Sequence, residues 1–209
     1  MKIVLATSNL GKVKEIKALL KDHEIYALSE ILTPFEIVED GTSFKENALI
    51  KSRAVFEALR KKGLENEFIS LSDDSGISVE ALGFAPGIYS ARYSGANATD
   101  ASNRAKLIAN LNALNLDRAS AFYTACIGIN CVFGEYSAHG FMYGDVINKE
   151  RGESGFGYDF MFIPRGFDKT IGELDERIKS QISHRAKALK NAEILLNFIQ
   201  KRTKFLTFI

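Results

Sequence analysis

The chain has 209 residues, 46% of them hydrophobic, which is enough to bury a sizeable core in one large domain. With 27 Lys and Arg against 26 Asp and Glu, the net charge of +1 excludes a bulk electrostatic attraction to nucleic-acid polymers or membrane surfaces. No apolar run approaches the roughly 20 residues that span a bilayer, and we expect no membrane segment. Cys126 and Cys131 lie five residues apart on one expected strand and face opposite sides, which argues against a mutual disulfide and fits a reducing cytoplasm.

The N-terminal half alternates short apolar runs with amphipathic helices. In chain order we expect a strand over 2–6, a polar turn over 7–11, a helix over 12–20, a β-like segment over 35–38, a helix over 44–62, a buried strand over 68–72 and a helix over 100–112. Ser43 and Thr99 precede the second and third helices and are suited to cap them, because their hydroxyl oxygens accept hydrogen bonds from first-turn amides.

The C-terminal half begins with a β pattern and ends with a helix. Residues 122–133 and 136–147 are rich in aromatic and β-branched residues and are separated by Gly134-Glu135, which predicts an antiparallel hairpin. A short strand over 160–163 and a final helix over 184–201 follow. Crossover-type and hairpin-type strands together predict an α/β fold with a mixed central sheet flanked by helices. We expect a single domain over 1–209, with two lobes and a ligand-binding cleft between them.

Two adjacent carboxylates, Asp73 and Asp74, follow the expected strand over 68–72. Adjacent ionised carboxylates repel, so a buried pair needs a cation, a proton or several hydrogen-bond donors. Mg²⁺ takes oxygen ligands and combines one or two carboxylates with substrate phosphates. Because neighbouring strand residues face opposite sides, the two carboxylates do not hold one ion together unless the backbone turns, and a third carboxylate would be useful. The alternative is a polar turn that caps a helix.

Glu46 is the candidate for that third carboxylate. It shares its helix with Asn47 and Lys51, polar residues on neighbouring turns of an otherwise apolar helix, which favours a polar site. The alternative is a capping box, in which Ser43 caps the helix and Glu46 reaches back to the amide of Ser43.

A candidate phosphate-binding segment lies between the first strand and the first helix. Its residues are Thr7, Ser8, Asn9, Leu10, Gly11 and Lys12. Backbone N–H groups and the helix dipole favour an anion at such a position, and Lys12 adds positive charge. The glycine spacing of a P-loop is absent, and an ordinary capped turn is the alternative.

Two further groups are candidates for binding a planar base. In Gly155-Phe156-Gly157-Tyr158-Asp159, glycines let the backbone approach a ligand and an aromatic ring can stack on it. Lys179, His184 and Arg185 gather near the start of the last helix, where Arg donates in a rigid fork and His donates or accepts. The alternatives are a glycine-rich turn with core aromatics and a solvated helix start.

Six segments, TSNLGK, FKENA, SDDSG, APGIYSARYSG, GFGYD and SHR, occur in an order that resembles the inosine triphosphate pyrophosphatase family, over residues 2 to about 196. The resemblance implies a nucleotide-binding cleft and hydrolysis of the purine nucleoside triphosphates ITP, dITP and XTP to the monophosphate and pyrophosphate. It also implies Mg²⁺ as cofactor and a homodimer.

The resemblance also implies a role for each motif residue. Asp74 is then the proton acceptor and a metal ligand, Glu46 a second metal ligand, and Asp73 a supporting carboxylate of the metal site. The residues implied to bind the triphosphate are Thr7, Ser8, Asn9, Leu10, Gly11, Lys12, Lys51 and Ser75. Those implied to bind the base, accepting a 6-oxo purine and refusing the 6-amino group of adenine, are Phe156, Gly157, Tyr158, Asp159, Lys179, His184 and Arg185.

Three positions depart from the family pattern: Ser8 and Ala186 stand where glycine is common, and Phe160 where proline is common. They bear on loop geometry and substrate ranking more than on activity. The apolar extension over 204–209 lies beyond the resemblance and would pack on the core or on a dimer partner. Two other functions stay open: a nucleotide-binding protein without turnover, and a Maf-like pyrophosphatase that prefers modified pyrimidine nucleotides.

Overall fold

A computed structural model describes residues 1–206 of the chain, with side chains described as far as Thr203. The chain divides into two compact units. Unit 1 comprises Met1–Asp74, Ala125–Gly140 and the chain from Arg185 onward, and unit 2 comprises Ser75–Thr124 and Phe141–His184. The C-terminal extension is outside the described residues from 207 onward, and its side chains are outside them from 204.

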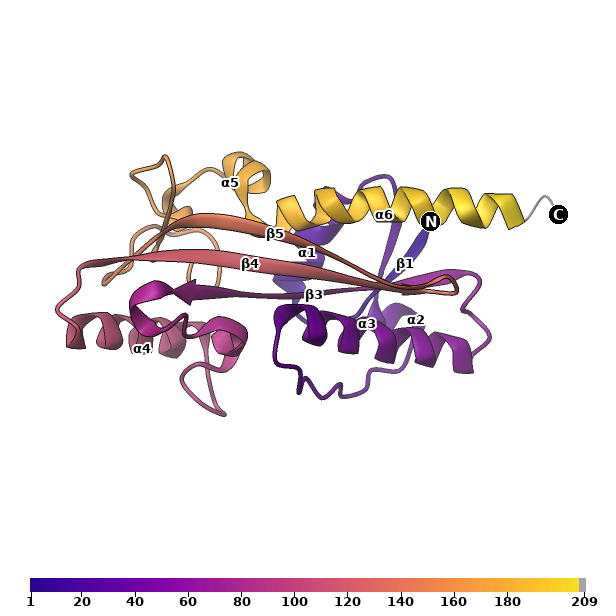
Figure 1. The fold of residues 1–209 in the computed structure, drawn as a ribbon, viewed down its shortest axis with the longest axis horizontal. Helices are drawn as coiled ribbons and strands as arrows, with labels where there is room; N and C mark the ends of the chain where they lie inside the picture. The colour runs from indigo at the N-terminus through magenta and orange to yellow at the C-terminus, as the bar shows by residue number, and fades with distance from the viewer. Residues whose placement is uncertain (207–209) are drawn as a thin grey trace. The chain divides into compact units, whose positions relative to one another are not determined.

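The elements are distributed over both units (Figure 1). Unit 1 contains β1 (Lys2–Leu5), α1 (Leu10–Leu19), β2 (Glu24–Ala27), α2 (Leu28–Ile31), α3 (Phe44–Lys61) and nearly all of α6 (His184–Leu206). Unit 2 contains the 3₁₀ helices η1 (Glu80–Leu82), η2 (Gly87–Arg92) and η3 (Ile171–Glu173), the helices α4 (Asp100–Ala113) and α5 (Glu176–Ile182), and β6 (Phe162–Pro164). Strands β3 (Phe68–Val79), β4 (Arg118–Cys131) and β5 (Gly134–Ile147) contribute residues to both units.

The six strands form one sheet in the order β2-β1-β3-β4-β5-β6. Strand β1 pairs in parallel with β2 and with β3, whereas β5 pairs antiparallel with β6. The predicted α/β fold with a mixed sheet flanked by helices is therefore confirmed.

Strand β3 presents apolar side chains to one face of unit 1 and hydroxyls to the other. Ile69 and Leu71 join a buried cluster with side chains of α1 and α6. Ser70 and Ser72 each donate a hydrogen bond of 2.6 Å to a backbone carbonyl of α3. This alternation follows from the two-residue period of a strand. Helices α6 and α3 accordingly lie on opposite sides of the unit 1 strands (Figure 1).

The glycine at position 128 lets α3 pack close to strand β4. A Cβ atom there would lie 2.7 Å from both the carbonyl oxygen of Ala48 and the Oγ of Ser72, too close for any larger residue. This close approach fixes the distance between α3 and the sheet. It thereby also fixes the position of Lys51, which lies about one turn after Ala48 on α3.

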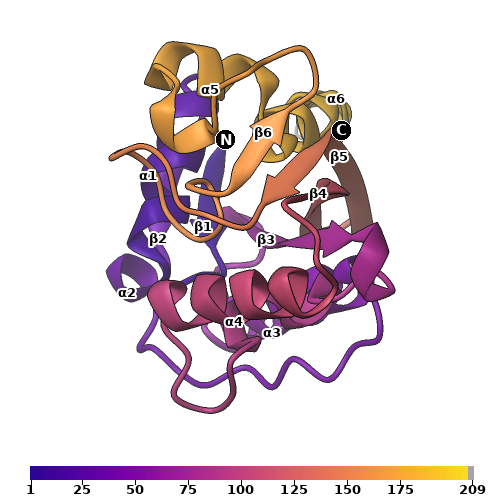
Figure 2. The same cartoon turned by 90° about the vertical axis from the view of Figure 1, so that its left-hand side faces the viewer.

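In unit 2, helix α4 packs an apolar face against the sheet (Figure 2). Its Leu107 and Leu111 are fully buried and share a core cluster with Ile77, Tyr123 and Phe162, which come from β3, β4 and β6. Thr99 caps α4 and accepts a hydrogen bond of 3.1 Å from the amide of Ser102, as the sequence predicts.

The predicted strand over 35–38 is wrong. Phe35 and Val38 are exposed, and no regular strand forms there, because the segment has no buried sheet face to join despite its apolar composition. The hairpin exists, but its turn is Val132–Phe133 rather than Gly134-Glu135, and Gly134 begins β5 with φ of 118°. Strand β6 begins at Phe162, two residues after the start of the strand predicted over 160–163.

Among the described residues, no helix is long and apolar enough to cross a membrane. Cys126 and Cys131 are both buried and free, in agreement with the prediction that they do not form a mutual disulfide. Burial raises the pKa of the Cys126 thiol to about 12, so this group stays protonated and unreactive at neutral pH.

Candidate functional site

Asp73 is a buried carboxylate with two cationic partners. Its side chain faces α1 and α6, on the same side of β3 as Ile69 and Leu71. The Oδ2 atom lies 2.7 Å from Nζ of Lys12 and 3.2 Å from Nη2 of Arg185. The guanidinium of Arg185 is also ion-paired with Glu15 of α1. Asp73 therefore joins the start of α1 to the start of α6 through buried charge.

Asp74 faces the opposite side of the sheet and is ion-paired with Lys51 of α3. Its Oδ1 atom accepts a hydrogen bond of 2.9 Å from Nζ of Lys51, and the same Nζ donates at 2.8 Å to Glu39. Burial raises the pKa of Asp74 above its usual value, and the attraction of Lys51 only partly offsets this effect. A carboxyl group with a raised pKa is a better proton acceptor than an exposed Asp.

The second oxygen of Asp74 is the observation that fits a cation. Within the described part of the chain, Oδ2 of Asp74 is buried and has no hydrogen-bond partner. A hard cation such as Mg²⁺ takes carboxylate oxygens and completes its coordination with phosphate oxygens. No group of three or more His, Cys, Asp or Glu side chains that could hold a metal occurs among the described residues. Oδ2 of Asp74 therefore offers one donor atom of the kind that such an ion binds.

Glu46 lies in the first turn of α3 and points back along the chain. Its Oε2 atom accepts hydrogen bonds of 2.7 Å from both the amide and the hydroxyl of Thr42. Ser43 caps the helix through a 3.1 Å hydrogen bond from the amide of Glu46. The cap is thus confirmed, but the glutamate binds Thr42 rather than the amide of Ser43, which the predicted capping box requires. The hydrogen bonds from Thr42 lower the pKa of Glu46, so the carboxylate stays ionised.

The candidate phosphate segment, Thr7 to Lys12, connects β1 to α1. Asn9 caps α1, and its Oδ1 atom accepts a hydrogen bond of 3.1 Å from the amide of Lys12. Ser8, Asn9 and Leu10 are exposed, and the amide of Asn9 donates at 3.2 Å to Oγ1 of Thr7. An exposed helix start that carries a lysine suits an anion.

The Gly155–Phe160 segment of unit 2 contains most of the predicted base-binding residues. Asp159 is buried and accepts hydrogen bonds of 3.0 Å from Nζ of Lys179 and 3.2 Å from the amide of Phe156. Lys179 also lies over the ring of Phe156, 4.9 Å from its centroid. Phe156 and Gly157 are half-buried, whereas Tyr158 is buried and donates from its hydroxyl at 2.8 Å to the carbonyl of Ser90. The half-buried ring of Phe156 is the part of this segment that can stack on a ligand.

The remaining predicted residues have different surroundings. His184 of unit 2 is buried and stacks on Tyr123, with ring centroids 4.5 Å apart and planes inclined by 9°. Arg185 of unit 1 is only 2% exposed and belongs with Asp73 and Glu15. Ser75 is half-buried and follows Asp74 directly on β3. A direct contact between Arg185 and a base stays a prediction.

The sequence motifs do not identify three residues that support the site. Glu15 and Glu39 complete the ion pairs of Arg185 and Lys51, and Tyr123 supports His184. Each comes from a different element than its partner, so no local spacing marks it. For Glu15 the sequence does offer one signal, because this residue directly precedes the buried Ile16 in the amphipathic helix α1.

The comparisons with known proteins agree with one another. A model of the Ham1 family matches residues 3–194. A dITP/XTP pyrophosphatase of Campylobacter fetus subsp. fetus is 65% identical over 204 residues, covering 98% of this chain and 100% of that protein. One from Campylobacter concisus is 64% identical, covering 96% and 99%.

Solved structures show the same fold. The Staphylococcus aureus Ham1 protein aligns with a TM-score of 0.80 at 35% identity, covering 97% of this chain and 100% of that chain. A HAM1 protein from Coxiella burnetii aligns with a TM-score of 0.82 at 35% identity, covering 94% and 98%.

Substitution of the two neighbouring carboxylates should destabilise the protein to different extents. Asp73→Asn removes the carboxylate shared by the buried Arg185 and the half-buried Lys12, leaves Arg185 with Glu15 alone, and should lower the unfolding free energy by about 3–5 kcal/mol. Asp74→Asn should cost less than about 1 kcal/mol, because burial already disfavours its charge and Lys51 keeps Glu39. Urea unfolding at neutral pH measures both values. Asp22→Asn, at an exposed carboxylate, is the control, and equal losses at positions 73 and 74 would contradict the assignment.

Proposed function

This chain belongs to the Ham1 family, and we propose that it is a nucleoside triphosphate pyrophosphatase that hydrolyses the deaminated purine nucleotides ITP, dITP and XTP. The products are the nucleoside monophosphate and pyrophosphate. Relatives named dITP/XTP pyrophosphatase align with nearly the whole chain at up to 65% identity. The observation that carries the proposal is Asp74, a buried carboxylate with a raised pKa, one oxygen held by Lys51 and one oxygen without a hydrogen-bond partner in the described structure.

Mg²⁺ is the proposed cofactor, and Asp74 and Glu46 are its proposed protein ligands. The buried Oδ2 of Asp74 and the ionised carboxylate of Glu46 support this choice, because both offer hard oxygen atoms. When bound, the ion would neutralise phosphate charge and lower the pKa of water. Asp73 supports the site indirectly in this proposal, since it holds Lys12 and Arg185 in place.

Residues of the chain itself accept the proton and bind the triphosphate. Asp74 accepts the proton of the water that attacks the α-phosphorus, while the pyrophosphate leaves. Lys12 and Lys51, together with the Thr7–Gly11 segment and Ser75, bind the triphosphate. Lys51 keeps its charge in the buried site, because Asp74 and Glu39 raise its pKa against the opposing effect of burial. A fixed positive charge beside the base also keeps Asp74 ionised when a phosphate approaches.

Unit 2 supplies the proposed base contacts. The ring of Phe156 stacks on the purine, and the Gly155–Phe160 segment with Lys179 and His184 recognises its edge. A 6-oxo purine presents an acceptor at O6 and a donor at N1, whereas adenine presents the reverse pattern. Fixed donors and acceptors therefore refuse adenine by leaving polar groups unpaired.

Experiments must distinguish this function from two others. A nucleotide-binding protein without turnover would not need the unpaired oxygen and raised pKa of Asp74. A Maf-like enzyme would prefer modified pyrimidine triphosphates, and the names of the relatives favour purines instead. The proposed location is the cytoplasm, where the nucleoside triphosphate pool is made and used.

We also propose that the protein is a homodimer, and a surface of unit 2 supports this. Phe84, Phe122, Phe141 and Tyr143 form a connected row with centroid distances of 5.8–6.3 Å. Three of them are 39–56% exposed. With about 150–250 Å² per aromatic side chain, the row offers roughly 300 Å² of apolar area, a suitable centre for an interface of about 800 Å² per partner.

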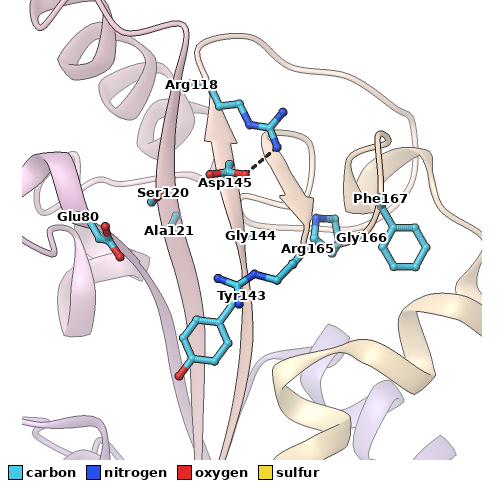
Figure 3. A pocket seen from close by; sticks show the side chains of 11 residues that line it. Glu80, Arg118, Ser120, Ala121, Tyr143, Gly144, Asp145, Arg165, Gly166 and Phe167 are labelled. Atoms are coloured by element: carbon cyan, nitrogen blue, oxygen red, sulfur yellow. Dashed lines mark hydrogen bonds and ion pairs between the residues drawn. The ribbon is translucent and has the colours of Figure 1, made fainter.

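The charges around this row suit a second copy of the chain. Tyr143 also lines a pocket of about 200 Å³. In this pocket Arg165 lies beside Tyr143, and Glu80 lies on the other side (Figure 3). The guanidinium of Arg165 is 5.6 Å from the centroid of the Tyr143 ring, and Arg118 pairs with Asp145 at 2.6 Å. A surface with both signs of charge can meet itself across a twofold axis.

A substrate panel tests the reaction. With Mg²⁺ present, we expect pyrophosphate release from ITP, dITP and XTP with kcat/KM at least about 100-fold above that for ATP, because adenine leaves polar groups of the site unpaired. Modified pyrimidine triphosphates and dUTP complete the panel. Preference for those pyrimidines would establish the Maf-like alternative, and ITP binding without turnover in Mg²⁺ or Mn²⁺ would overturn the enzyme assignment.

Asp74→Asn tests the proton acceptor. We expect pyrophosphate release from dITP to fall by about 10²–10⁴-fold, since the amide cannot accept the proton. Circular dichroism and dITP binding should stay close to the unsubstituted protein. Asp22→Asn again serves as the matched control, and a near-normal rate in Asp74→Asn would refute the assignment.

Tyr143→Asp tests the dimer surface. Light scattering after size exclusion should give a dimer for the unsubstituted protein and a monomer for the variant, because the new charge is buried at the interface. Phe198→Asp changes an aromatic residue of similar exposure in unit 1, 52% against 50%, and should leave the dimer intact. A monomeric parent protein would refute the dimer, and a dimeric Tyr143→Asp would refute the surface.

A further inference from the structure

Both backbone polar groups of Gly157 are bound by one helix. The amide of Gly157 donates a hydrogen bond of 2.8 Å to Oδ2 of Asp100, and its carbonyl accepts one of 2.9 Å from Nη1 of Arg104. Asp100 and Arg104 stand four residues apart on α4 and so share one face of that helix. Gly157 has φ of 59°, a left-handed conformation that glycine adopts without strain. Two side chains therefore fix the orientations of the two peptide groups that flank Gly157.

Arg104 makes two further contacts that hold it in place. Its Nε atom pairs with Glu150 at 3.0 Å, and its guanidinium lies 4.7 Å from the centroid of the Phe160 ring. The Arg104 side chain is only 12% exposed. Arg104 thus binds the middle of the Gly155–Phe160 segment through a hydrogen bond to Gly157 and the end of the segment by stacking on Phe160. Phe160 stands where proline is common in the family.

The start of the same segment is fixed independently by Asp159. A Cβ atom at position 155 would lie 2.6 Å from Oδ2 of Asp159, so only glycine allows this approach. The same oxygen holds Lys179 and the amide of Phe156. One part of the segment is therefore tied to Asp159 and Lys179, and the other part is tied to α4.

We propose that Arg104, with Asp100, is a positioning residue that sets the selectivity between 6-oxo and 6-amino purines. This inference rests on the proposed function, because it assumes that the Gly155–Phe160 segment contacts the base. Arg104 does not itself touch the substrate. It acts through the peptide groups on either side of Gly157 and through the ring of Phe160.

The physical reason is the steep geometry of hydrogen bonds. The two purine classes differ in the donor and acceptor pattern of one edge, and a site can refuse the wrong pattern only when its own polar groups cannot turn to fit it. A segment released from α4 can rotate its peptide groups and accommodate both bases. Triphosphate binding is common to all of these substrates and is unaffected, so the loss appears in selectivity more than in turnover.

The test compares Arg104→Ala and Arg104→Lys with Lys106→Ala. Lys106 is on the same helix and likewise donates to a backbone carbonyl and lies over a ring, at 2.6 Å and 4.5 Å, but its partner for both contacts is Tyr93, outside the segment. The measured quantity is the ratio of kcat/KM for dITP to kcat/KM for dATP. Hydrogen exchange of peptides covering 155–160 reports on the positioning without any need for activity.

We expect Arg104→Ala to lower the ratio about tenfold or more, with kcat for dITP reduced less than threefold, and to speed exchange over 155–160. Arg104→Lys, which keeps the charge but not the fork, should give an intermediate ratio, and Lys106→Ala should match the parent protein. An unchanged ratio in folded Arg104→Ala, or an equal loss in Lys106→Ala, would overturn the inference. If Arg104→Ala does not fold, Arg104→Lys and Asp100→Ala decide by the same ratio. A parent protein that does not prefer dITP would instead refute the proposed function.

Discussion

The buried carboxylates of β3 are the constraint on which unit 1 depends. A buried charge without a partner costs several kcal/mol, so Asp73 requires both α1 and α6 to be in position, through Lys12 and Arg185. Asp74 makes a weaker demand of α3, because its partner Lys51 is shared with Glu39. The two-residue period of the strand distributes these demands to opposite faces of the sheet. Folding of unit 1 and assembly of its charged cluster are therefore one process, and a helix that ends the chain is tied to residues near its beginning.

The same constraint gives the two carboxylates different chemistry. Asp73 is matched by two cations, Lys12 and Arg185, which link it to α1 and α6. Asp74 shares its one cation with Glu39, and burial raises its pKa. Its remaining oxygen is free to bind an ion or to accept a proton. The strand thus turns consecutive carboxylates toward environments with different numbers of compensating charges, which is why we propose a structural role for Asp73 and a reactive one for Asp74.

Local patterns in the sequence predict much of this architecture, and distant partners explain what they do not predict. Ser43 and Thr99 cap helices where expected, since capping depends on residues three positions apart. The alternation of Ile69 to Asp74 predicts that the carboxylates face opposite ways, and their partners on different helices confirm it. Glu15 and Glu39 could not be predicted, because each meets its partner only when separate elements pack. The strand predicted over 35–38 fails for the same reason: its composition suits a sheet, but no sheet face is available to it.

Selectivity makes a different demand on the molecule than phosphate binding does. Contacts to a triphosphate stabilise every nucleoside triphosphate equally and cannot separate one base from another. Charged side chains such as Lys12 and Lys51 can therefore be strong binders without being selective. Discrimination must come from neutral groups whose directions are fixed, and in unit 2 a backbone segment with a left-handed glycine has this property because Asp100 and Arg104 hold both sides of Gly157. A glycine segment whose peptide groups could rotate would not discriminate between bases. The left-handed glycine therefore contributes to selectivity only because neighbouring side chains fix its conformation.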